Sequence, residues 1–518
     1  MPIIMTRPPN VLFLLTDQHA PRVAGFAGDP VVRTQHLDAL ADRAVQFDTA
    51  ICASPVCTPS RMSMMTALEP HRCAAWNNHW VIHPEHVTWP RHMAAHGYHT
   101  ALIGKMHFGG RDQMQGFGHR PYGDLRHGLG HQPDPIEHFP SHAGAGAAGP
   151  TQIPESLLQD VVVTRESLAH ILELHHASPD QPWFVCASYQ RPHPPYTAPG
   201  RYIRRYRGKL EPLNVPADID NRLDPYARHI KPGETGDQLT DEQTMRAREA
   251  YYASVDFVDD CMGELIDGLS DAGALDNTII IYTSDHGDMI GQHGLWGKAI
   301  YFEPSIGVPL LIAGPGIAPQ NARVADPISL MDLFPTVADL CDLPIPDNLD
   351  GVDFSALLRD PRNAAPARAF APSEYFQYGV RVRGANSPLE TEPYRAMRAI
   401  RTRDWKYVDI EGGDPLLFDM VNDPQELDSR AADPQHADRC ATMRAQLFEG
   451  FSWQHVHEQL AADRERLPQL LSGQKPSTPN QYMLPDGRIF DAEKELYDAR
   501  WIDLPDVPGG GIIPQQFG

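Results

Sequence analysis

Asn10-Val-Leu-Phe-Leu-Leu-Thr-Asp17-Gln18-His19 is an apolar run that ends abruptly in polar residues. Its apolar residues do not alternate with polar ones, a pattern typical of a strand buried on both faces of a parallel sheet. Ligands of open α/β sheets bind outside the carboxyl ends of such strands. We therefore expect Asp17 and Gln18 to lie in a binding site, with the alternative that Asp17 only caps the next turn.

A second stretch, Thr278-Ile-Ile-Ile-Tyr-Thr-Ser-Asp285-His286, repeats this arrangement. Strands that alternate with helical segments predict an α/β fold, in which a mostly parallel sheet is flanked by helices. The two strand ends would then offer Asp285 and His286 beside Asp17 and Gln18. Three further strands are expected, at residues 99–104, 183–188 and 308–313.

The character of the sequence changes at about residue 380. Short alternating segments beyond this point are typical of a small antiparallel sheet. We expect a catalytic domain over residues 1–380 and a small C-terminal α+β subdomain over 381–455. Residues 456–518 would form an extension that packs on the body of the protein or on a neighbouring subunit.

The composition is that of a globular protein, with 518 residues of which 42% are hydrophobic and 21% charged. A formal net charge of −23 argues against nucleic acid as a partner, because such binding relies on Lys and Arg that neutralise phosphates. The 7 cysteines are scattered and suggest no disulfide framework. The start of the chain has no apolar segment ahead of the first strand, and the apolar run from Val11 to Leu15 is too short for a signal peptide or a membrane span. We expect a cytoplasmic protein with reduced thiols.

Cys57-Thr58-Pro59-Ser60-Arg61 reads as a loop that enters a helix. Pro59 suits the first helical position and Thr58 can act as the N-cap. Cys57 would then lie at a helix N-terminus, where backbone N–H groups favour negative charge, and Arg61 about one turn along. On this reasoning Cys57 is either a buried structural cysteine or a nucleophile that the helix activates.

Five more candidate residues follow strands or lie in loops. Lys105 and His107 come directly after the expected strand at 99–104, and Lys298 follows the Asp285 strand. The prolines of Arg191-Pro-His193-Pro-Pro hold His193 in one place, although His193 alone would more often be structural. Asn78 lies in a polar loop that can line a pocket or pack as an ordinary loop.

Asp17, Gln18, Asp285 and His286 together offer three oxygen ligands and one imidazole. This donor set suits one hard to borderline divalent ion, Ca²⁺ or Mn²⁺, better than zinc, which prefers more nitrogen and sulfur. The sequence therefore predicts a metal site at the carboxyl edge of the sheet.

The motifs taken together resemble the sulfatase family within the alkaline phosphatase superfamily. The resemblance covers most of residues 8–430, and Cys57-x-Pro59-Ser60-Arg61 is similar to the family's signature. Gln18 and His286 depart from the commoner aspartate and asparagine, and they resemble the branch that holds phosphonate monoester hydrolases and dimeric bacterial arylsulfatases. The resemblance implies an alkaline-phosphatase-like fold and, with it, a homodimer or homotetramer.

In the family, the signature cysteine is oxidised after translation to Cα-formylglycine by a formylglycine-generating enzyme. The resemblance implies that residue 57 is hydrated to a geminal diol, joins the metal ligands, attacks the sulfur of a small anionic ester and forms a covalent sulfo-enzyme. Arg61, Lys105 and Lys298 would hold the sulfuryl oxygens. His193, with Lys298, would protonate the leaving group, and His107 would take the proton whose loss expels sulfate.

Three functions compete at this stage. Arylsulfatase-type hydrolysis of sulfate monoesters leads. Hydrolysis of phosphonate monoesters or phosphodiesters would use the same metal and nucleophile, and the enzyme could be promiscuous for both. Lys105 and His107 favour the sulfatase, because they supply more positive charge than the neutral hydroxyl residues found at the matching positions of phosphonate hydrolases. An anion-binding relative with an unmodified Cys57 is the non-enzymatic alternative. We expect Asn78 to contact the substrate.

Overall fold

The computed structural model describes residues 7–78, 82–83, 85–108, 112, 114–122, 144–216, 218, 219–230, 239–318, 321–376, 396–472, 481–483 and 489–491. The extension expected over 456–518 lies largely outside these residues. None of the described helices has the length and apolar character needed to cross a membrane. All seven cysteines are free thiols.

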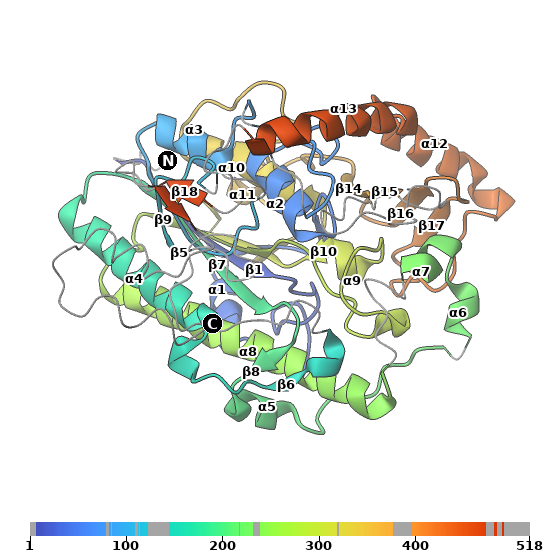
Figure 1. Ribbon diagram of the computed structural model, residues 1–518, viewed down its shortest axis with the longest axis horizontal. Helices are drawn as coiled ribbons and strands as arrows, with labels where there is room; N and C mark the ends of the chain where they lie inside the picture. Colours follow the sequence, from blue (N-terminus) through green and yellow to red (C-terminus); the bar gives the residue numbers. More distant parts are fainter. Residues whose placement is uncertain are drawn as a thin grey trace.

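An eight-stranded sheet forms the centre of the protein (Figure 1). Its strands, in spatial order, are β12 (Ala322–Val324), β2 (Val45–Phe47), β11 (Leu310–Ala313), β9 (Thr278–Ser284), β1 (Asn10–Asp17), β7 (Trp183–Pro192), β4 (His99–Gly104) and β5 (His119–Tyr122). Every pairing in it is parallel except those of β11 with β9 and with β2. The expected mostly parallel sheet is confirmed.

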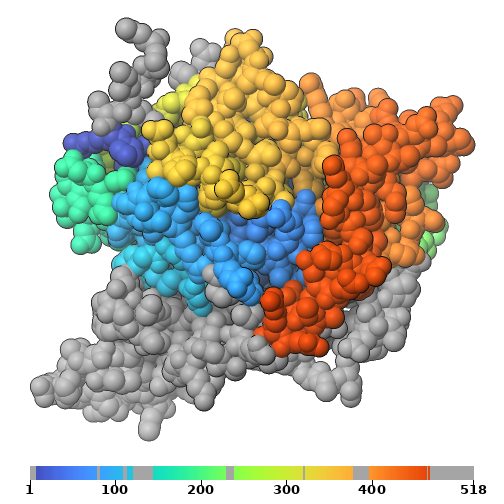
Figure 2. Space-filling model, turned by 90° about the horizontal axis from the view of Figure 1, so that it is seen from above, coloured from blue at the N-terminus to red at the C-terminus, as the bar shows by residue number. Residues whose placement is uncertain are grey.

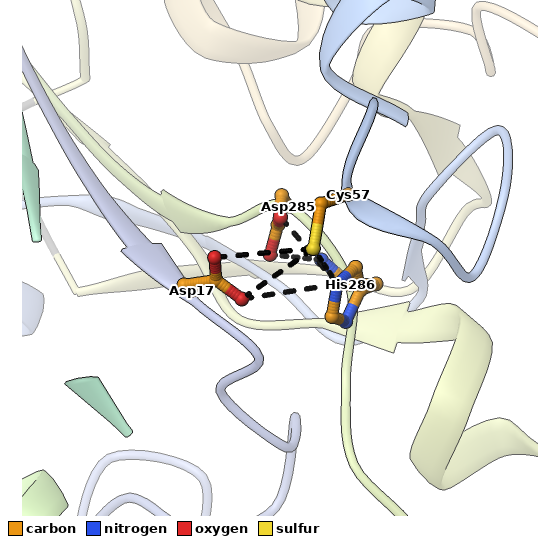
Figure 3. Close-up of side chains that lie close together, drawn as sticks. All are labelled: Asp17, Cys57, Asp285 and His286. Atoms are coloured by element: carbon orange, nitrogen blue, oxygen red, sulfur yellow. Dashed lines mark hydrogen bonds and ion pairs between the residues drawn. The ribbon is translucent and has the colours of Figure 1, made fainter. Parts of the chain in front are cut away.

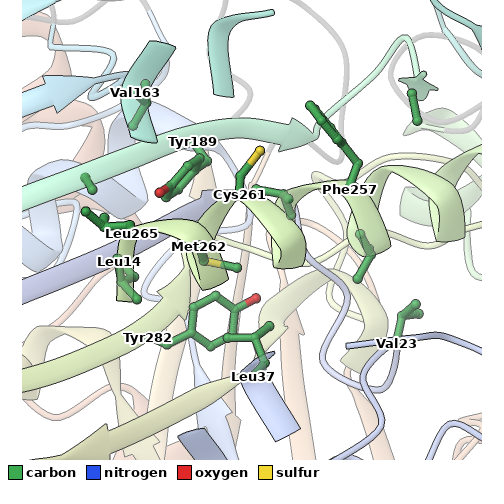
Figure 4. Close-up of a cluster of buried hydrophobic side chains, with 14 of the residues drawn as sticks. Leu14, Val23, Leu37, Val163, Tyr189, Phe257, Cys261, Met262, Leu265 and Tyr282 are labelled. Carbon is green, nitrogen blue, oxygen red and sulfur yellow. The ribbon is translucent and has the colours of Figure 1, made fainter. Parts of the chain in front are cut away.

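Helices cover both faces of this sheet, because its central strands are apolar on both sides. On one face, Leu12 and Leu14 of β1 pack in a cluster with α1 (Gln35–Ala41), α4 (Gln159–Ala177) and α8 (Asp241–Asp271). Figure 4 shows α8 residues such as Met262 and Leu265 beside Leu14 and Tyr282. On the other face, Phe13 and Leu15 pack with α2 (Cys57–Thr66), α3 (Trp89–Ala95) and α10 (Leu333–Leu340).

A smaller antiparallel sheet lies beside the main body, as expected. Its order is β14 (Ala371–Phe376), β15 (Ala396–Arg401), β16 (Trp405–Ile410) and β17 (Leu416–Asp419). The strand β14 pairs with β15 although it precedes residue 381, the expected start of the small subdomain. The helices α12 (Ala437–Leu447) and α13 (Trp453–Ser472), orange-red in Figure 2, cover this end of the molecule.

Candidate active site

Four side chains meet where the central strands end (Figure 3). Asp17 is the last residue of β1, Asp285 and His286 follow β9, and Cys57 enters from the helix α2. One ligand atom from each lies within 4.8 Å of the others, and all four residues are buried. The sheet brings them together because β1 and β9 are parallel neighbours, with Thr16 opposite Ser284. The convergence expected from the two strand ends is therefore confirmed.

The helix that carries Cys57 begins earlier than the sequence suggests. Its N-cap is Val56, whose carbonyl accepts from Ser60 N at 3.0 Å, and Cys57 is its first residue. Thr58 was expected as the N-cap but lies inside the first turn, where its hydroxyl donates to the carbonyl of His107 at 2.9 Å. The prediction failed because Thr58 makes this tertiary hydrogen bond instead of a local cap.

Arg61 lies beneath the four side chains, with no exposed surface. Its Nε donates to Asp285 Oδ2 at 2.8 Å and its Nη2 to Asp17 Oδ2 at 3.1 Å. Nη1 donates to the carbonyl of Lys105 at 2.8 Å and to Ser188 Oγ at 3.3 Å. Arg61 thus binds both carboxylates and holds them in a fixed relation to each other and to α2.

Gln18 adds a second kind of oxygen to the site. Its backbone is in the left-handed region, with φ of 70°, and its N–H donates to Asp285 Oδ1 at 3.0 Å. Its side-chain Nε2 donates to Asp288 Oδ2 at 2.7 Å. The other amide atom, Oε1, is buried and has no hydrogen-bond partner among the described residues. A buried oxygen of this kind is costly unless it has a ligand, so Gln18 fits the expected metal ligand.

Asp288 was not among the site residues predicted from the sequence. Besides Gln18, it accepts from the hydroxyl of Tyr196 at 2.6 Å and from the N–H groups of Ile290 and Gly297. It thereby fixes the orientation of the Gln18 amide. The position of Asp288 three residues after Asp285 was the only sequence signal for it.

Two lysines reach the same point. Lys298 Nζ donates to Cys57 Sγ at 3.0 Å and lies 3.1 Å from His286 Nε2. Lys105 Nζ forms an ion pair with Asp17 Oδ2, and only 3% of Lys105 is exposed. His286 Nδ1 lies 3.0 Å from the carbonyl of Gly287, a contact in which Nδ1–H donates. This bond leaves the lone pair of His286 Nε2 for a cation, as in metal-bound histidines.

Two histidines complete the set expected from the sequence. His193 Nδ1 lies 2.7 Å from the carbonyl of Pro194, so Nδ1 donates its proton to that carbonyl. The second ring nitrogen, Nε2, is then the atom that can exchange a proton with a substrate. Burial, together with the nearby charges of Lys105 and Lys298, lowers the pKa of His193 to about 3. His107, in the left-handed region with φ of 55°, is hydrogen-bonded to Cys57 through its side chain.

Asn78 touches the nucleophile helix. Its side-chain oxygen accepts from Thr58 N at 2.9 Å, so it satisfies one of the free N–H groups at the helix start. The neighbouring Trp76 is buried and donates from Nε1 to Asp463 of α13 at 2.9 Å. The structure thus gives Asn78 a capping contact, while the expected substrate contact stays a prediction.

The charges at the site act strongly on one another. Burial and the Cys57 thiolate raise the pKa of Asp17, but Lys105, His193 and Arg61 outweigh them and hold it well below its usual range. Burial likewise raises the pKa of the Cys57 thiol, and Lys298, Lys105 and His286 lower it well below its usual value. The site is therefore built to stabilise negative charge at residue 57.

A family model described as Sulfatase matches residues 9–343, nearly two thirds of the chain. The chain belongs to the sulfatase family. A second family model, described as the C-terminal part of N-sulphoglucosamine sulphohydrolase, matches residues 291–451. A choline-sulfatase of Rhizobium meliloti (strain 1021) is 32% identical over 458 residues, which are 85% of this chain and 86% of that protein.

Solved structures show the same fold. The phosphonate monoester hydrolase of Agrobacterium radiobacter superposes with a TM-score of 0.72 at 23% identity, covering 85% of this chain and 96% of that chain. A protein solved in complex with its substrate D-glucosamine-2-N,6-O-disulfate has a TM-score of 0.67 at 21% identity. The match covers 88% of this chain and 99% of that chain. The expected family, the alkaline-phosphatase-like fold and the class of enzyme, a sulfuric ester hydrolase, are confirmed.

Proposed function

We propose that this enzyme hydrolyses sulfate monoesters by arylsulfatase-type chemistry, after Cys57 has been converted to Cα-formylglycine. The observation that carries the proposal is the position of residue 57. Its side chain lies between a cluster suited to a metal ion and Lys298, at the N-terminus of α2. As the family resemblance implies, the hydrated aldehyde would supply the attacking hydroxyl and carry the sulfuryl group in a covalent sulfo-enzyme.

Asp17, Gln18, Asp285 and His286 would hold one divalent ion, Ca²⁺ or Mn²⁺, together with residue 57. The buried Gln18 Oε1 and the three acidic or imidazole side chains provide the mixture of oxygen and nitrogen that these ions accept. When bound, the ion would lower the pKa of a hydroxyl at residue 57 and stabilise charge on the substrate.

The polypeptide contributes the charges that surround the ester. Lys298, only 3.0 Å from Cys57 Sγ, and Lys105 would bind the sulfuryl oxygens, whose negative charge increases in the transition state. Arg61 would hold the two carboxylates in place, because its hydrogen bonds to Asp17 and Asp285 fix them relative to α2. A contact between Arg61 and the sulfuryl oxygens, which the family resemblance implies, stays part of the proposal.

Proton transfer falls to the two histidines. His193 is neutral at pH 7 in the free enzyme, since its pKa is about 3. An anionic substrate beside it would favour its charged form, so we propose that it takes up a proton on substrate binding and gives it to the leaving alcohol. His107, hydrogen-bonded to residue 57, would accept the proton whose loss releases sulfate.

Hydrolysis of phosphonate monoesters or phosphodiesters is the second candidate, because Gln18 and His286 resemble the metal ligands of that branch. Lys105 and His107 favour sulfate esters. The test compares one purified preparation on an aryl sulfate, choline sulfate, an aryl phosphodiester and a phenylphosphonate monoester. Choline sulfate is included because the relative in Rhizobium meliloti is a choline-sulfatase.

We expect a sulfate monoester to have the highest kcat/KM in this series. A phosphorus ester that exceeded both sulfates by orders of magnitude would overturn the proposal. Cys57→Ala serves as the control in each assay, and it should lose the activity. Cytoplasmic location, maturation by a formylglycine-generating enzyme and assembly as a homodimer or homotetramer remain part of the proposal.

A further inference from the structure

The small antiparallel sheet makes buried contacts both with the segment that carries residue 57 and with the segment that carries Lys298. We propose that this sheet positions residue 57 and Lys298 relative to each other, and that it positions Lys298 through Lys406 of β16. The proposal rests on the catalytic role of Lys298 given above. It assigns a function in the reaction to a strand that lies outside the active site.

Lys406 has no exposed surface, and its ammonium group is surrounded by acceptors. Its Nζ donates to the carbonyl of Tyr301 at 2.9 Å and to Glu303 Oε2 at 3.3 Å, and it pairs with Glu426 Oε1. These three acceptors match the three protons of an ammonium group. Lys406 carries one positive charge against the two carboxylates of Glu303 and Glu426. Arg401, whose Nε lies 3.2 Å from Glu303 Oε2, supplies the second positive charge. A lysine buried in this way can hold the backbone at Tyr301 in one position.

The backbone at Tyr301 leads directly to Lys298. Between them, Ala299 has a left-handed φ of 69°, donates its N–H to the carbonyl of Pro55 at 3.0 Å, and accepts from the hydroxyl of Tyr226 at 3.2 Å. The segment is thus attached to the loop before Cys57 at one end and to Lys406 at the other. A shift of the Tyr301 carbonyl would be passed on to the Lys298 side chain.

The same sheet also contacts the other side of the nucleophile segment. Glu374 of β14 donates its N–H to the carbonyl of Ala53 at 2.8 Å, and its Oε1 accepts from His71 N at 2.7 Å. Ala53 and His71 flank α2. Arg398 of β15 donates to Glu374 Oε2 at 2.9 Å and so completes a buried ion pair. The sheet therefore contacts the segments of both catalytic residues and fixes one relative to the other.

The strand β16 itself provides a matched control. Lys406, Val408 and Ile410 face the main body, whereas Asp409 points to the opposite face, where its carboxylate accepts from Trp453 Nε1 at 3.1 Å. The variant Asp409→Asn therefore disturbs a polar contact of the same strand without touching the Tyr301 carbonyl. A general loss of stability in the small sheet would appear in both variants.

The test is a double-mutant cycle on the holoenzyme with an ester that the wild type hydrolyses. Lys406→Met should lower kcat by roughly 10–100-fold with KM changed less than about twofold, because a small displacement of a catalytic group has an effect of this size. In the Lys298→Ala background, Lys406→Met should change kcat by less than about twofold. Asp409→Asn should leave kcat within about twofold of the wild type.

Should Lys406→Met not fold, Lys406→Arg keeps the charge and its longer side chain displaces the Tyr301 carbonyl, so it enters the same cycle. If the substitution at Lys406 lowered kcat equally in the wild-type and the Lys298→Ala backgrounds, the proposal would be overturned. A crystal structure of the variant separates this outcome from a failure of the proposed function, because it needs no turnover. Lys298 displaced from residue 57 would support the proposal, and an unchanged Lys298 would contradict it.

Discussion

Replacement of Asp288 by asparagine tests how the Gln18 amide is directed at the metal site. Asp288 Oδ1 accepts from the N–H groups of Ile290 at 2.9 Å and Gly297 at 3.1 Å, whereas Oδ2 accepts from Gln18 Nε2 at 2.7 Å and Tyr196 at 2.6 Å. In Asp288→Asn, the amide oxygen has to stay with the two backbone donors. The new Nδ2 then faces the donor Nε2 of Gln18, so the Gln18 amide must rotate and turn its oxygen away from the proposed metal site.

The magnitude follows from the loss of one correctly oriented ligand. Changes of this type in the groups that orient metal ligands weaken metal binding roughly 10–100-fold, which corresponds to about 1.4–2.7 kcal/mol. The assay is calorimetric titration of chelator-treated protein with Ca²⁺ and with Mn²⁺. Tyr196→Phe removes one hydrogen bond to Asp288 but leaves Gln18 correctly paired, so its affinity should stay within a few-fold of the wild type. Wild-type affinity in Asp288→Asn would refute the assignment of Gln18 as a ligand.

Three further predictions concern charged and titratable groups, two of them at the active site and one elsewhere in the protein. Lys298→Ala should lower kcat roughly 10²–10³-fold, as the loss of a group that stabilises transition-state charge does, and an unchanged kcat would remove it from the mechanism. Because His193 has to be protonated to act as the general acid and its pKa in the free enzyme is about 3, its contribution to kcat/KM should fall as the pH rises above about 3; a pH profile between pH 5 and 8 that is the same in the wild type and in His193→Ala would contradict this role. Burial lowers the pKa of His170 to about 3, with help from neighbouring histidines, and that of His293 to about 4. Both would titrate near 6.5 when unfolded, so stability should be complete above about pH 6.5 and fall as the pH drops toward 4, which thermal melts at pH 7.5, 6 and 5 would show; melting temperatures independent of pH would contradict it.

The main sheet and the convergence of the candidate metal ligands could be predicted from the sequence for a simple reason. An apolar run with no alternation that ends in Asp17 or Asp285 combines a buried parallel strand with a polar residue at its carboxyl end. Parallel neighbours place those ends side by side, so the convergence follows from topology alone. The prediction needed no knowledge of the side-chain conformations.

Some contacts of Arg61 and Asp288 could not be predicted from the sequence. Arg61 was expected close to the anion from its place one turn after Cys57, but its hydrogen bonds to the carboxylates of Asp17 and Asp285 had no sequence signal. The direction of a long side chain depends on contacts with β1 and β9, which are far away in the sequence. The orientation of Gln18 by Asp288 is likewise a contact between distant segments.

The start of α2 shows how tertiary contacts override a local signal. Thr58 and Pro59 form a good N-cap and first-turn pair, but the helix begins at Cys57. The Thr58 hydroxyl bonds to His107, and Asn78 satisfies the Thr58 N–H instead. The consequence is functional, because Cys57 is held inside the first turn of the helix and not in a loose loop.

Mass spectrometry of the peptide that contains residue 57, on a preparation whose activity has been measured, shows whether Cys57 is converted to formylglycine. We expect an aldehyde at residue 57, in a fraction that rises in proportion to kcat between preparations. A fully active enzyme in which residue 57 is present only as the cysteine thiol would contradict this expectation.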